Sequence, residues 1–226
     1  NDNGLVTRDE YLGVFYPSLF TSDNAGNNVV VPPSHGMLRT LALSDQVSFP
    51  WFAPAGTRRG GITNASASGF VDAEGEFKSI ALNEGQRDTL YSLNINPITF
   101  LTGAGLVNFG QKTRAKNASA LDRINVARLV IYLRSQLKKL AKPYIFEPND
   151  KITRDEIKAQ VDSLMLELVS QRALYDFLVV CDESNNTPAR IDRNELYVDI
   201  AIEPVKAVEF IYIPLRLKNT GEIAGL

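Results

Sequence analysis

The sequence has almost none of the residue types on which metal sites and many enzyme sites depend. It contains a single histidine, His35, and a single cysteine, Cys181, in 226 residues. One cysteine excludes an internal disulfide and carries no sign of an oxidising compartment. One histidine excludes a His-rich metal site, and any catalytic triad with an imidazole base would have to use His35. Carboxylate chemistry remains open, because the chain has 26 Asp and Glu residues.

Long hydrophobic runs are also missing. No apolar run approaches the roughly 20 residues that cross a bilayer, and the first residues are polar, so we expect neither a signal peptide nor a membrane anchor. With 44% hydrophobic and 22% charged residues, the composition is ordinary for a soluble globular protein of one large or two modest domains. The chain begins at Asn1 rather than Met, which is typical of a piece of a longer protein.

Charge is unevenly distributed along the chain, although the formal net charge of −2 gives no reason to expect nucleic acid as a partner. Residues 111–143 contain nine Lys and Arg against Asp122 alone, for a net +8. Residues 147–203 contain thirteen Asp and Glu against six Lys and Arg, for a net −7. Blocks of opposite sign favour association between copies of the chain. Two solvated helix faces explain the pattern equally well, and both interpretations stay open.

The front half alternates short strands with short helices, the pattern of an α/β layer. Two neighbouring strands or a hairpin are predicted in 11–20 and 27–34, around a polar turn. We expect Ser34 to cap a helix over 36–45. That helix would turn Met37, Leu41 and Leu38 inward. The other predicted elements are a loop at 49–69, strands at 77–82, 95–101 and 105–111, and a helix at 83–94.

Two longer helices are predicted in the centre of the chain. Residues 121–142 carry apolar side chains at helical spacing, with most Lys and Arg elsewhere on the wheel, and Pro143 ends the helix. A second helix is expected to begin at "TRDE", where Thr153 and Glu156 fit a capping box. Its apolar face is formed by Ile157, Val161, Leu164 and Leu168.

After these helices the hydrophobic period changes from 3.6 to 2, which is typical of strands. Strands are predicted at 175–182, 194–204 and 207–217, with a polar connection at 183–192. Pro214 interrupts the row of backbone donors in the last strand, and proline is tolerated only at edges or bulges, so we expect an edge strand there. The middle strand alternates strictly and places on one face Leu196, Val198, Ile200 and Ile202.

The stretch "GAGLVNFGQKT" (103–113) comes close to a phosphate-binding loop. Gly105 and Gly110 have the required spacing, and Lys112 and Thr113 follow. Gln111, however, separates the second glycine from the lysine, and one extra residue rotates the next side chains by roughly 100° about a helix axis. The next segment is polar and does not open a helix directly. We therefore predict a strand and turn rather than a nucleotide site.

The few candidates for chemistry have ordinary structural explanations. His35 lies at a predicted helix start, and Cys181 lies in an apolar strand, where a thiol is usually a small core residue. No pair of carboxylates stands in an apolar context that would raise a pKa, and 183–192 lacks the glycine and spacing of a calcium loop. We therefore predict no catalytic residue, no cofactor and no metal, and a carboxylate-based hydrolase is the weakest alternative.

Several ordered blocks of the chain resemble contractile phage (myovirus) tail sheath proteins. In the C-terminal part they include "RINVARLVIYLRSQL", "PYIFEPND", "TRDEI" and the run from "LYDFLVVCDESNN" to "FIYIPL". Further forward, "VPPSHGMLRTLALSDQVSFPWFAPAG" and "LYSLNINPITFLTGAGLVNFGQKT" resemble other family segments. Each block alone is weak, but their combination and order are specific. Family members are usually far longer, so the chain resembles their conserved inner, C-terminal part.

The resemblance implies an α/β (α+β) fold with mixed sheets and flanking helices, and a small C-terminal sheet completed by strands from neighbouring subunits. It divides the chain into a front part of the sheath core, residues 1–115, and a C-terminal sheath domain, residues 116–226, with two helices followed by three strands. The implied function is that of a structural, non-enzymatic subunit. Such subunits stack in helical rings around a tail tube and contract, which drives the tube through the host envelope. The sheath of a bacterial contractile injection system or pyocin is the alternative.

The implied partners are other copies of the subunit, the tail tube, the baseplate and the tail terminator, with no nucleic acid and no direct membrane contact. The implied location is the phage tail of the virion, after assembly in the host cytoplasm. The residues expected to pair as a strand between subunits are Ala207, Val208, Glu209, Phe210, Ile211, Tyr212, Ile213, Leu215 and Leu217. The residues expected to make charged contacts, either to the tube or to a neighbouring subunit, are Arg128, Arg134, Lys138, Lys139 and Lys142.

Overall fold

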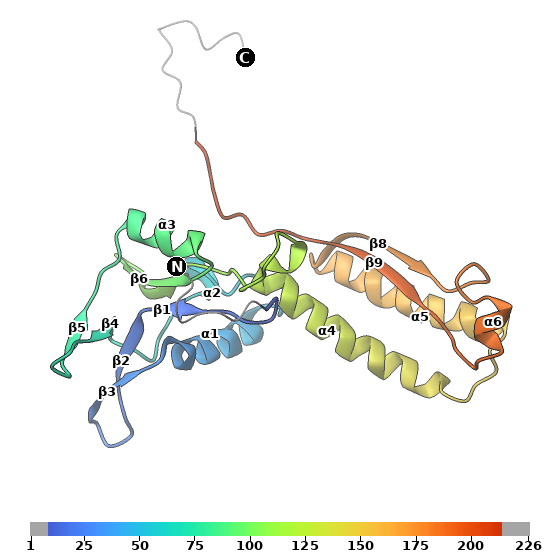
Figure 1. Ribbon diagram of the computed structural model, residues 1–226, viewed down its shortest axis with the longest axis horizontal. Helices are drawn as coiled ribbons and strands as arrows, with labels where there is room; N and C mark the ends of the chain where they lie inside the picture. Colours follow the sequence, from blue (N-terminus) through green and yellow to red (C-terminus); the bar gives the residue numbers. More distant parts are fainter. Residues whose placement is uncertain (1–8, 214–226) are drawn as a thin grey trace, which may run out of the picture.

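Two small sheets form the first part of the fold in a computed structural model, which describes residues 9–213. The first sheet is antiparallel with the order β3-β2-β4-β5, and the second has the order β1-β6-β7, with β1 parallel to β6. The strands are β1 (Phe15–Tyr16), β2 (Ser18–Ser22), β3 (Asn28–Val31), β4 (Ala67–Val71), β5 (Phe77–Ser79), β6 (Asn96–Leu101) and β7 (Gly105–Asn108). With helices α1, α2 and α3 they make up what we call the front lobe (Figure 1).

The predicted hairpin is confirmed, since β2 and β3 pair in antiparallel register from Leu19 with Val31 to Ser22 with Asn28. Helix α1 (Pro33–Val47) begins earlier than predicted, with Pro33 in its first turn. Proline is tolerated there because the first N–H groups of a helix have no partner within it. Ser34 therefore lies inside the helix instead of capping it. Met37 is buried as expected, whereas the Leu38 side chain is 70% exposed.

The predicted loop at 49–69 is interrupted by the short helix α2 (Gly56–Arg59) and by the start of β4. Helix α3 (Glu84–Ser92) confirms the helix predicted at 83–94. Its capping box is formed by Asn83 and Gln86, each of which accepts a hydrogen bond from the backbone N–H of the other. The cap satisfies backbone donors that the first helical turn leaves without a partner.

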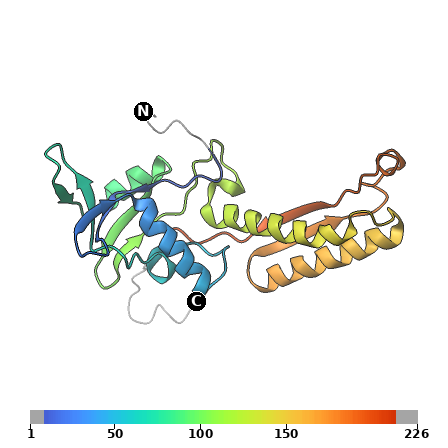
Figure 2. The ribbon, with the colours of Figure 1, turned by 90° about the horizontal axis from the view of Figure 1, so that it is seen from below.

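The second part of the molecule is a helix pair covered by two strands, which we call the helical lobe. It consists of α4 (Ile124–Ala141), α5 (Lys151–Ser170), β8 (Leu174–Val180), α6 (Pro188–Ile191) and β9 (Asp199–Pro204). Both ribbon views show α4 and α5 running side by side away from the front lobe, which gives an elongated molecule (Figures 1 and 2). Both long helices were predicted. No helix in residues 9–213 is long and apolar enough to span a bilayer.

Helix α5 begins one turn earlier than the proposed capping box. Asp150 is its N-cap, and the Asp150 carboxylate accepts a hydrogen bond from the Thr153 backbone N–H at 2.9 Å. Thr153 is therefore a buried residue of the first turn, and the prediction that it caps the helix with Glu156 was wrong. Asp and Thr are both favourable N-cap residues, and the helix begins after Asp150, which comes first in the sequence.

The strands after α5 differ from the prediction in length and number. β9 is shorter than the predicted 194–204 strand, although Leu196, Val198, Ile200 and Ile202 all pack against the core as its alternation requires. Within residues 9–213, β8 and β9 pair antiparallel and form a sheet of two strands. The third predicted strand is absent from the described residues: 207–213 has no strand, and 214–217, with Pro214, Leu215 and Leu217, lies outside them.

Each lobe has its own apolar core. The front core is small and is built from Leu19, Met37, Ile62, Ile98 and Leu106. The helical core is larger and contains Leu129 and Leu133 of α4, four residues of α5, and Cys181 after β8. Trp51 belongs to the helical core although its sequence position lies in the front half. The mixed α/β fold class is confirmed, while the domain boundary at residue 115 stays a prediction.

Candidate assembly interface

The β8–β9 sheet has two open edges within the described part of the chain, because each strand pairs only with the other there. The pairing runs from Leu174 with Pro204 to Val180 with Asp199, with a bulge after Leu174. An unpaired edge presents a row of N–H and C=O groups that another strand can bind. On the strand itself, Tyr175 and Leu178 are exposed. The sheet therefore has the geometry of a site for strand addition.

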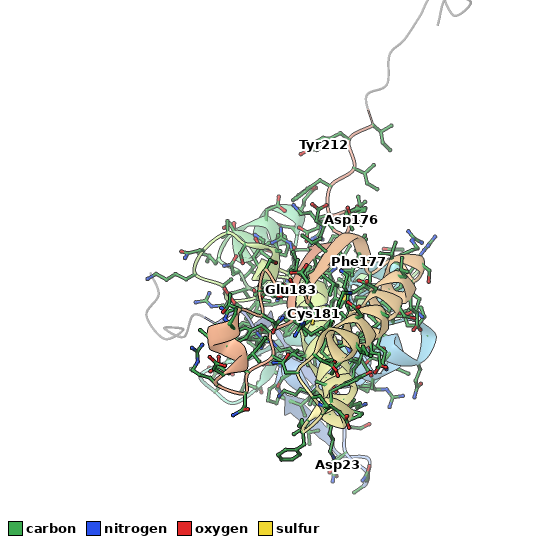
Figure 3. All side chains as sticks on the ribbon, turned by 90° about the vertical axis from the view of Figure 1, so that its right-hand side faces the viewer. Asp23, Asp176, Phe177, Cys181, Glu183 and Tyr212 are labelled. Atoms are coloured by element: carbon green, nitrogen blue, oxygen red, sulfur yellow. The ribbon has the colours of Figure 1, made fainter. Side chains whose placement is uncertain are left out.

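The segment after β9 first lies on the body and then leaves it. The Val205 backbone N–H donates to the Ala173 carbonyl at 3.0 Å, which continues the path of β9 by one residue. Ala207 and Glu209 are partly buried, whereas the side chains of 210–213 are at least 66% exposed. Figure 3 shows Tyr212 on the segment that projects away from the body, far from Cys181 and Glu183. We call residues from Phe210 onward the C-terminal arm.

Glu209 is held by its own chain, which the sequence did not indicate. Its carboxylate accepts hydrogen bonds from Arg123 Nε at 2.6 Å and Arg123 Nη2 at 3.0 Å, and from Gln111 Nε2 at 3.2 Å. Tyr91 also hydrogen-bonds this carboxylate. Burial alone would raise the pKa of Glu209, but the hydrogen bonds and charge of Arg123 outweigh it and hold that pKa below its ordinary value. The partners lie 86 and more residues earlier, so no local pattern reveals them.

The predicted basic contact residues fall into two groups. Arg128 Nη2 donates to both carboxylate oxygens of Asp45 at 2.7 and 2.6 Å, which ties α4 to α1 within the chain. The Arg134 guanidinium lies 5.6 Å from the centre of the Tyr11 ring. Lys138, Lys139 and Lys142 are exposed at the far end of α4. The sequence missed the internal partner of Arg128, because Asp45 is 83 residues away.

The segment that resembles a phosphate loop contains a strand and a turn, with the turn at 102–104 before β7 and irregular chain at 109–111 after it. β7 ends at Asn108, and a side chain at Gly110 would collide with Asn96, which explains the second glycine of the pattern. Lys112 Nζ donates to the Tyr91 carbonyl at 2.8 Å and lies 4.1 Å from the Tyr91 ring centre. Thr113 Oγ1 donates to the Leu121 carbonyl at 2.8 Å. The lysine and the hydroxyl thus both contact the protein itself.

The isolated reactive side chains also have structural surroundings. Cys181 is 1% exposed in the helical core, and burial raises the pKa of its thiol, which disfavours the nucleophilic thiolate. His35 is exposed in the first turn of α1. In the β4–β5 turn, the carboxylates of Asp72, Glu74 and Glu76 come within 4.8 Å of one another. Lys78 forms ion pairs with Asp72 and Glu76, which offset part of this charge.

A solved structure with the same architecture defines the class of fold. The contracted helical sheath of the anti-feeding prophage superposes with a TM-score of 0.80, covering 95% of this chain and 58% of that one at 22% identity. The fold is thus that of a contractile sheath subunit.

Relatives with higher identity name the family. The tail sheath protein of Vibrio phage KVP40 is 39% identical over 199 residues, which is 86% of this chain and 28% of the relative. That of Enterobacteria phage T4 is 34% identical over 200 residues, which is 87% of this chain and 29% of the relative. Residues 116–218 also match the phage tail sheath C-terminal domain family. The match assigns residues 116–218 to the phage tail sheath C-terminal domain family, in agreement with the sequence blocks, and the chain spans less than a third of the length of these relatives.

Proposed function

We propose that this chain is the inner, C-terminal part of a sheath subunit that polymerises in helical ring stacks around a tail tube and contracts to drive the tube through the host envelope. The match to the tail sheath family supports the role. The structural observation that carries it is an open-edged, two-stranded sheet beside an exposed apolar arm. A partner strand lengthens such a sheet by main-chain hydrogen bonds, and its side chains add apolar contacts.

The arm of one subunit pairs in this proposal with the β8–β9 sheet of another. The exposed residues Phe210, Ile211, Tyr212 and Ile213 supply the apolar surface of the added strand, whereas Val208, which is also exposed, lies before Glu209 on the part that stays with its own subunit. Ala207 lies on the same anchored part, and Leu215 and Leu217, which complete the set expected to pair, lie outside the described residues. Glu209, which the sequence places in the same set, is held by Arg123 and anchors the arm instead of pairing. Each subunit would thus both lend and receive a strand.

Deletion of the arm tests this role directly. Removal of residues from Phe210 onward takes away the added strand and leaves Glu209 and the β8–β9 sheet in place. We expect the full-length subunit to lose the ability to form sheaths or empty polysheaths, as seen by electron microscopy, while its thermal unfolding is unchanged. The control is Leu38→Ala, which removes from α1 an apolar side chain about as exposed as that of Phe210, and we expect this variant to assemble normally. Normal sheaths from the deletion variant would refute the proposal.

Strand pairing also suits a lattice that contracts. Backbone ladders between subunits keep the lattice connected while the bodies of the subunits rotate as rigid units. The extended sheath would then be metastable, held by a kinetic barrier rather than by the lowest free energy.

The exposed lysines at the end of α4 are proposed to contact an acidic surface, either of the tube or of a neighbouring subunit. We expect Lys138→Glu, Lys139→Glu and Lys142→Glu together to weaken assembly at low salt, and the defect to shrink as salt screens the charges. Lys116→Glu, at another exposed lysine, is the control. Assembly with and without tubes distinguishes the two surfaces. Unchanged assembly and contraction at every salt concentration would exclude a charged contact there.

The remaining partners belong to the same role: tube, baseplate and tail terminator proteins, in a virion tail assembled in the host cytoplasm, with no enzymatic activity. The tail sheath relatives from phages favour this assignment over a bacterial injection system. A gene neighbourhood that contains capsid genes beside tube and baseplate genes would support a phage tail.

A further inference from the structure

The segment between β9 and the arm crosses from the helical lobe to the front lobe. It starts beside the end of α5, where the Val205 N–H donates to the Ala173 carbonyl. It then passes the N-terminal turn of α4, where Asn125 Nδ2 lies 3.5 Å from the Val205 carbonyl oxygen. It ends at Glu209, against Gln111 and Tyr91 of the front lobe. We call residues 205–209 the strap.

The end of the strap is held by a bidentate ion pair between Arg123 and Glu209. Arg123 donates through Nε and Nη2 to the two carboxylate oxygens of Glu209, at 2.6 and 3.0 Å. The side chains are only 29% and 16% exposed, so water screens the pair less than it screens a surface ion pair. Two parallel hydrogen bonds also fix the relative orientation of the two groups, which a single contact does not.

Arg123 is itself fixed to the front lobe. It is the N-cap residue of α4 and forms an isolated β-bridge with Lys112. On either side of it, the Thr113 N–H donates to the Asp122 carbonyl and the Ile124 N–H donates to the Gln111 carbonyl. The Asp122 carboxylate lies 3.1 Å from Arg123 Nη1 and holds the guanidinium from the other side. The ion pair is therefore built on a rigid support.

Continuous exposure begins just after the ion pair. Exposed and partly buried residues alternate from Lys206 to Glu209, whose side chain is 16% exposed, whereas every residue in 210–213 is at least 66% exposed. We propose that the Arg123–Glu209 pair is a clamp that fixes the point and direction at which the C-terminal arm leaves the subunit, so that the arm begins to move at Phe210. The root of the arm then moves with the front lobe rather than with β8 and β9. This inference rests on the proposed function of the arm in strand pairing.

The clamp matters because register in an added strand depends on where its root is held. An extended chain spans roughly 3.3–3.6 Å per residue, so release of 206–209 would add on the order of 13 Å of slack. A one-residue slip also turns every side chain of a strand to the opposite face. When Glu209 is held, the arm can extend only a fixed distance from the body. This raises the effective concentration of the arm at the sheet edge of the neighbouring subunit.

Cleavage after Lys206 reports on the clamp without any assembly. Lys206 is exposed but lies within the strap, and trypsin requires a segment that can leave the body. In the full-length subunit we expect Glu209→Ala to speed this cleavage at least tenfold, because the variant loses hydrogen bonds between charged groups. Glu203→Ala, at an exposed glutamate on β9, should leave the rate unchanged. Equal rates in the Glu209→Ala and wild-type proteins would overturn the clamp.

A charge exchange separates the ion pair from a general structural effect. Arg123→Glu alone should also speed cleavage, because it places two carboxylates together. The double variant with Arg123→Glu and Glu209→Arg restores opposite charges, and we expect it to recover at least half of the lost protection on a logarithmic rate scale. Two single effects that simply add in the double variant would show that the two side chains do not act as a pair.

Assembly of the same variants then tests the positioning role. We expect Glu209→Ala to reduce sheath formation at least tenfold and the charge-exchange variant to restore it, while the unfolding temperature of Glu209→Ala falls only slightly and the protein stays folded. Faster cleavage with normal sheath yield would show a strap that does not direct the arm, and would overturn the inference. If deletion from Phe210 leaves assembly intact, the proposed strand pairing fails, while the cleavage result for the clamp still stands.

Discussion

The two lobes are held together by different kinds of interaction. The front lobe has a core of five buried hydrophobic residues and depends heavily on buried amides: Asn96 and Asn108 are both 0% exposed. Asn108 Nδ2 donates to the Pro54 and Gly110 carbonyls, which fastens two loops to the end of β7. The helical lobe instead packs an aliphatic core between two long helices and a sheet. Hydrogen bonds thus order irregular chain in one lobe, and apolar burial orders regular elements in the other.

Trp51 links the front half of the chain to the core of the helical lobe. It stacks on Phe49 with ring centres 4.8 Å apart, meets Tyr132 of α4 edge to face at 5.3 Å, and donates from Nε1 to the Gln171 carbonyl at 3.1 Å. A residue of the front half thereby fills the core of the helical lobe and caps the end of α5. The stability of the helical lobe should therefore depend on the front half.

Trp51→Ala is expected to have the largest effect on stability. Truncation of a buried Trp costs about 3–5 kcal/mol through the lost burial and the remaining cavity. We expect this loss in the free energy of unfolding from urea denaturation followed by circular dichroism. Phe49→Ala is the matched control, because Phe49 stacks on the same ring but is 41% exposed. If both variants cost the same small amount, Trp51 is not part of the helical core.

Asn96→Ala tests whether amides really order the front lobe. Asn96 Nδ2 donates to the Val14 and Lys112 carbonyls at 2.9 and 2.8 Å, and its Oδ1 accepts from the Lys112 N–H at 2.6 Å. The substitution leaves buried backbone groups without these partners, which should cost about 2–3 kcal/mol. Denaturation measures the loss, and Asn117→Ala, at an exposed asparagine, should change stability little. Equal stability of the two variants would contradict the comparison.

The smallest expected effect is a pH dependence at the junction of the lobes. Because the pKa of Glu209 is lower in the folded protein than its ordinary value of 4.5, the charged carboxylate adds stability above pH 4.5. That contribution is lost as the pH falls through the lower pKa of the folded state. The stability difference between wild type and Glu209→Gln should therefore be constant near neutral pH and shrink below pH 4.5. A difference that stays constant in acid would exclude Glu209 as its source.

Elements with a strong local signal were predictable from the sequence. The apolar spacing in 121–142 and the apolar face that begins at Ile157 place both long helices, although the cap predicted for the second one was wrong. The polar turn between two apolar runs places the β2–β3 hairpin. The family blocks were equally readable, because they are stretches of contiguous residues. Errors occurred where two local solutions compete, as with Asp150 and Thr153 at the start of α5.

The candidate interface was only half predictable. The alternation in 194–204 correctly separates the buried face of β9 from its exposed face. The strand predicted at 207–217 is not formed within 207–213, and its pairing between subunits stays a prediction. The sequence did not show that Glu209 belongs to a clamp or that Arg128 is bound to Asp45. These pairs join residues 83 and 86 positions apart, and either carboxylate is indistinguishable by sequence from a solvated one.

The order of the amino acids was enough to define the longer helices, most of the strands, the buried faces of the two long helices and the family blocks, because each of these depends on the spacing of neighbouring residues. Three features emerged only from the folded chain: the last sheet has two strands within the described residues, Trp51 belongs to the helical lobe, and the arm leaves the body after Glu209. An ion pair, an open sheet edge and a shared core form between residues that are distant in the sequence and meet only on folding. The local propensities of the residues do not specify which distant residue each of them will contact.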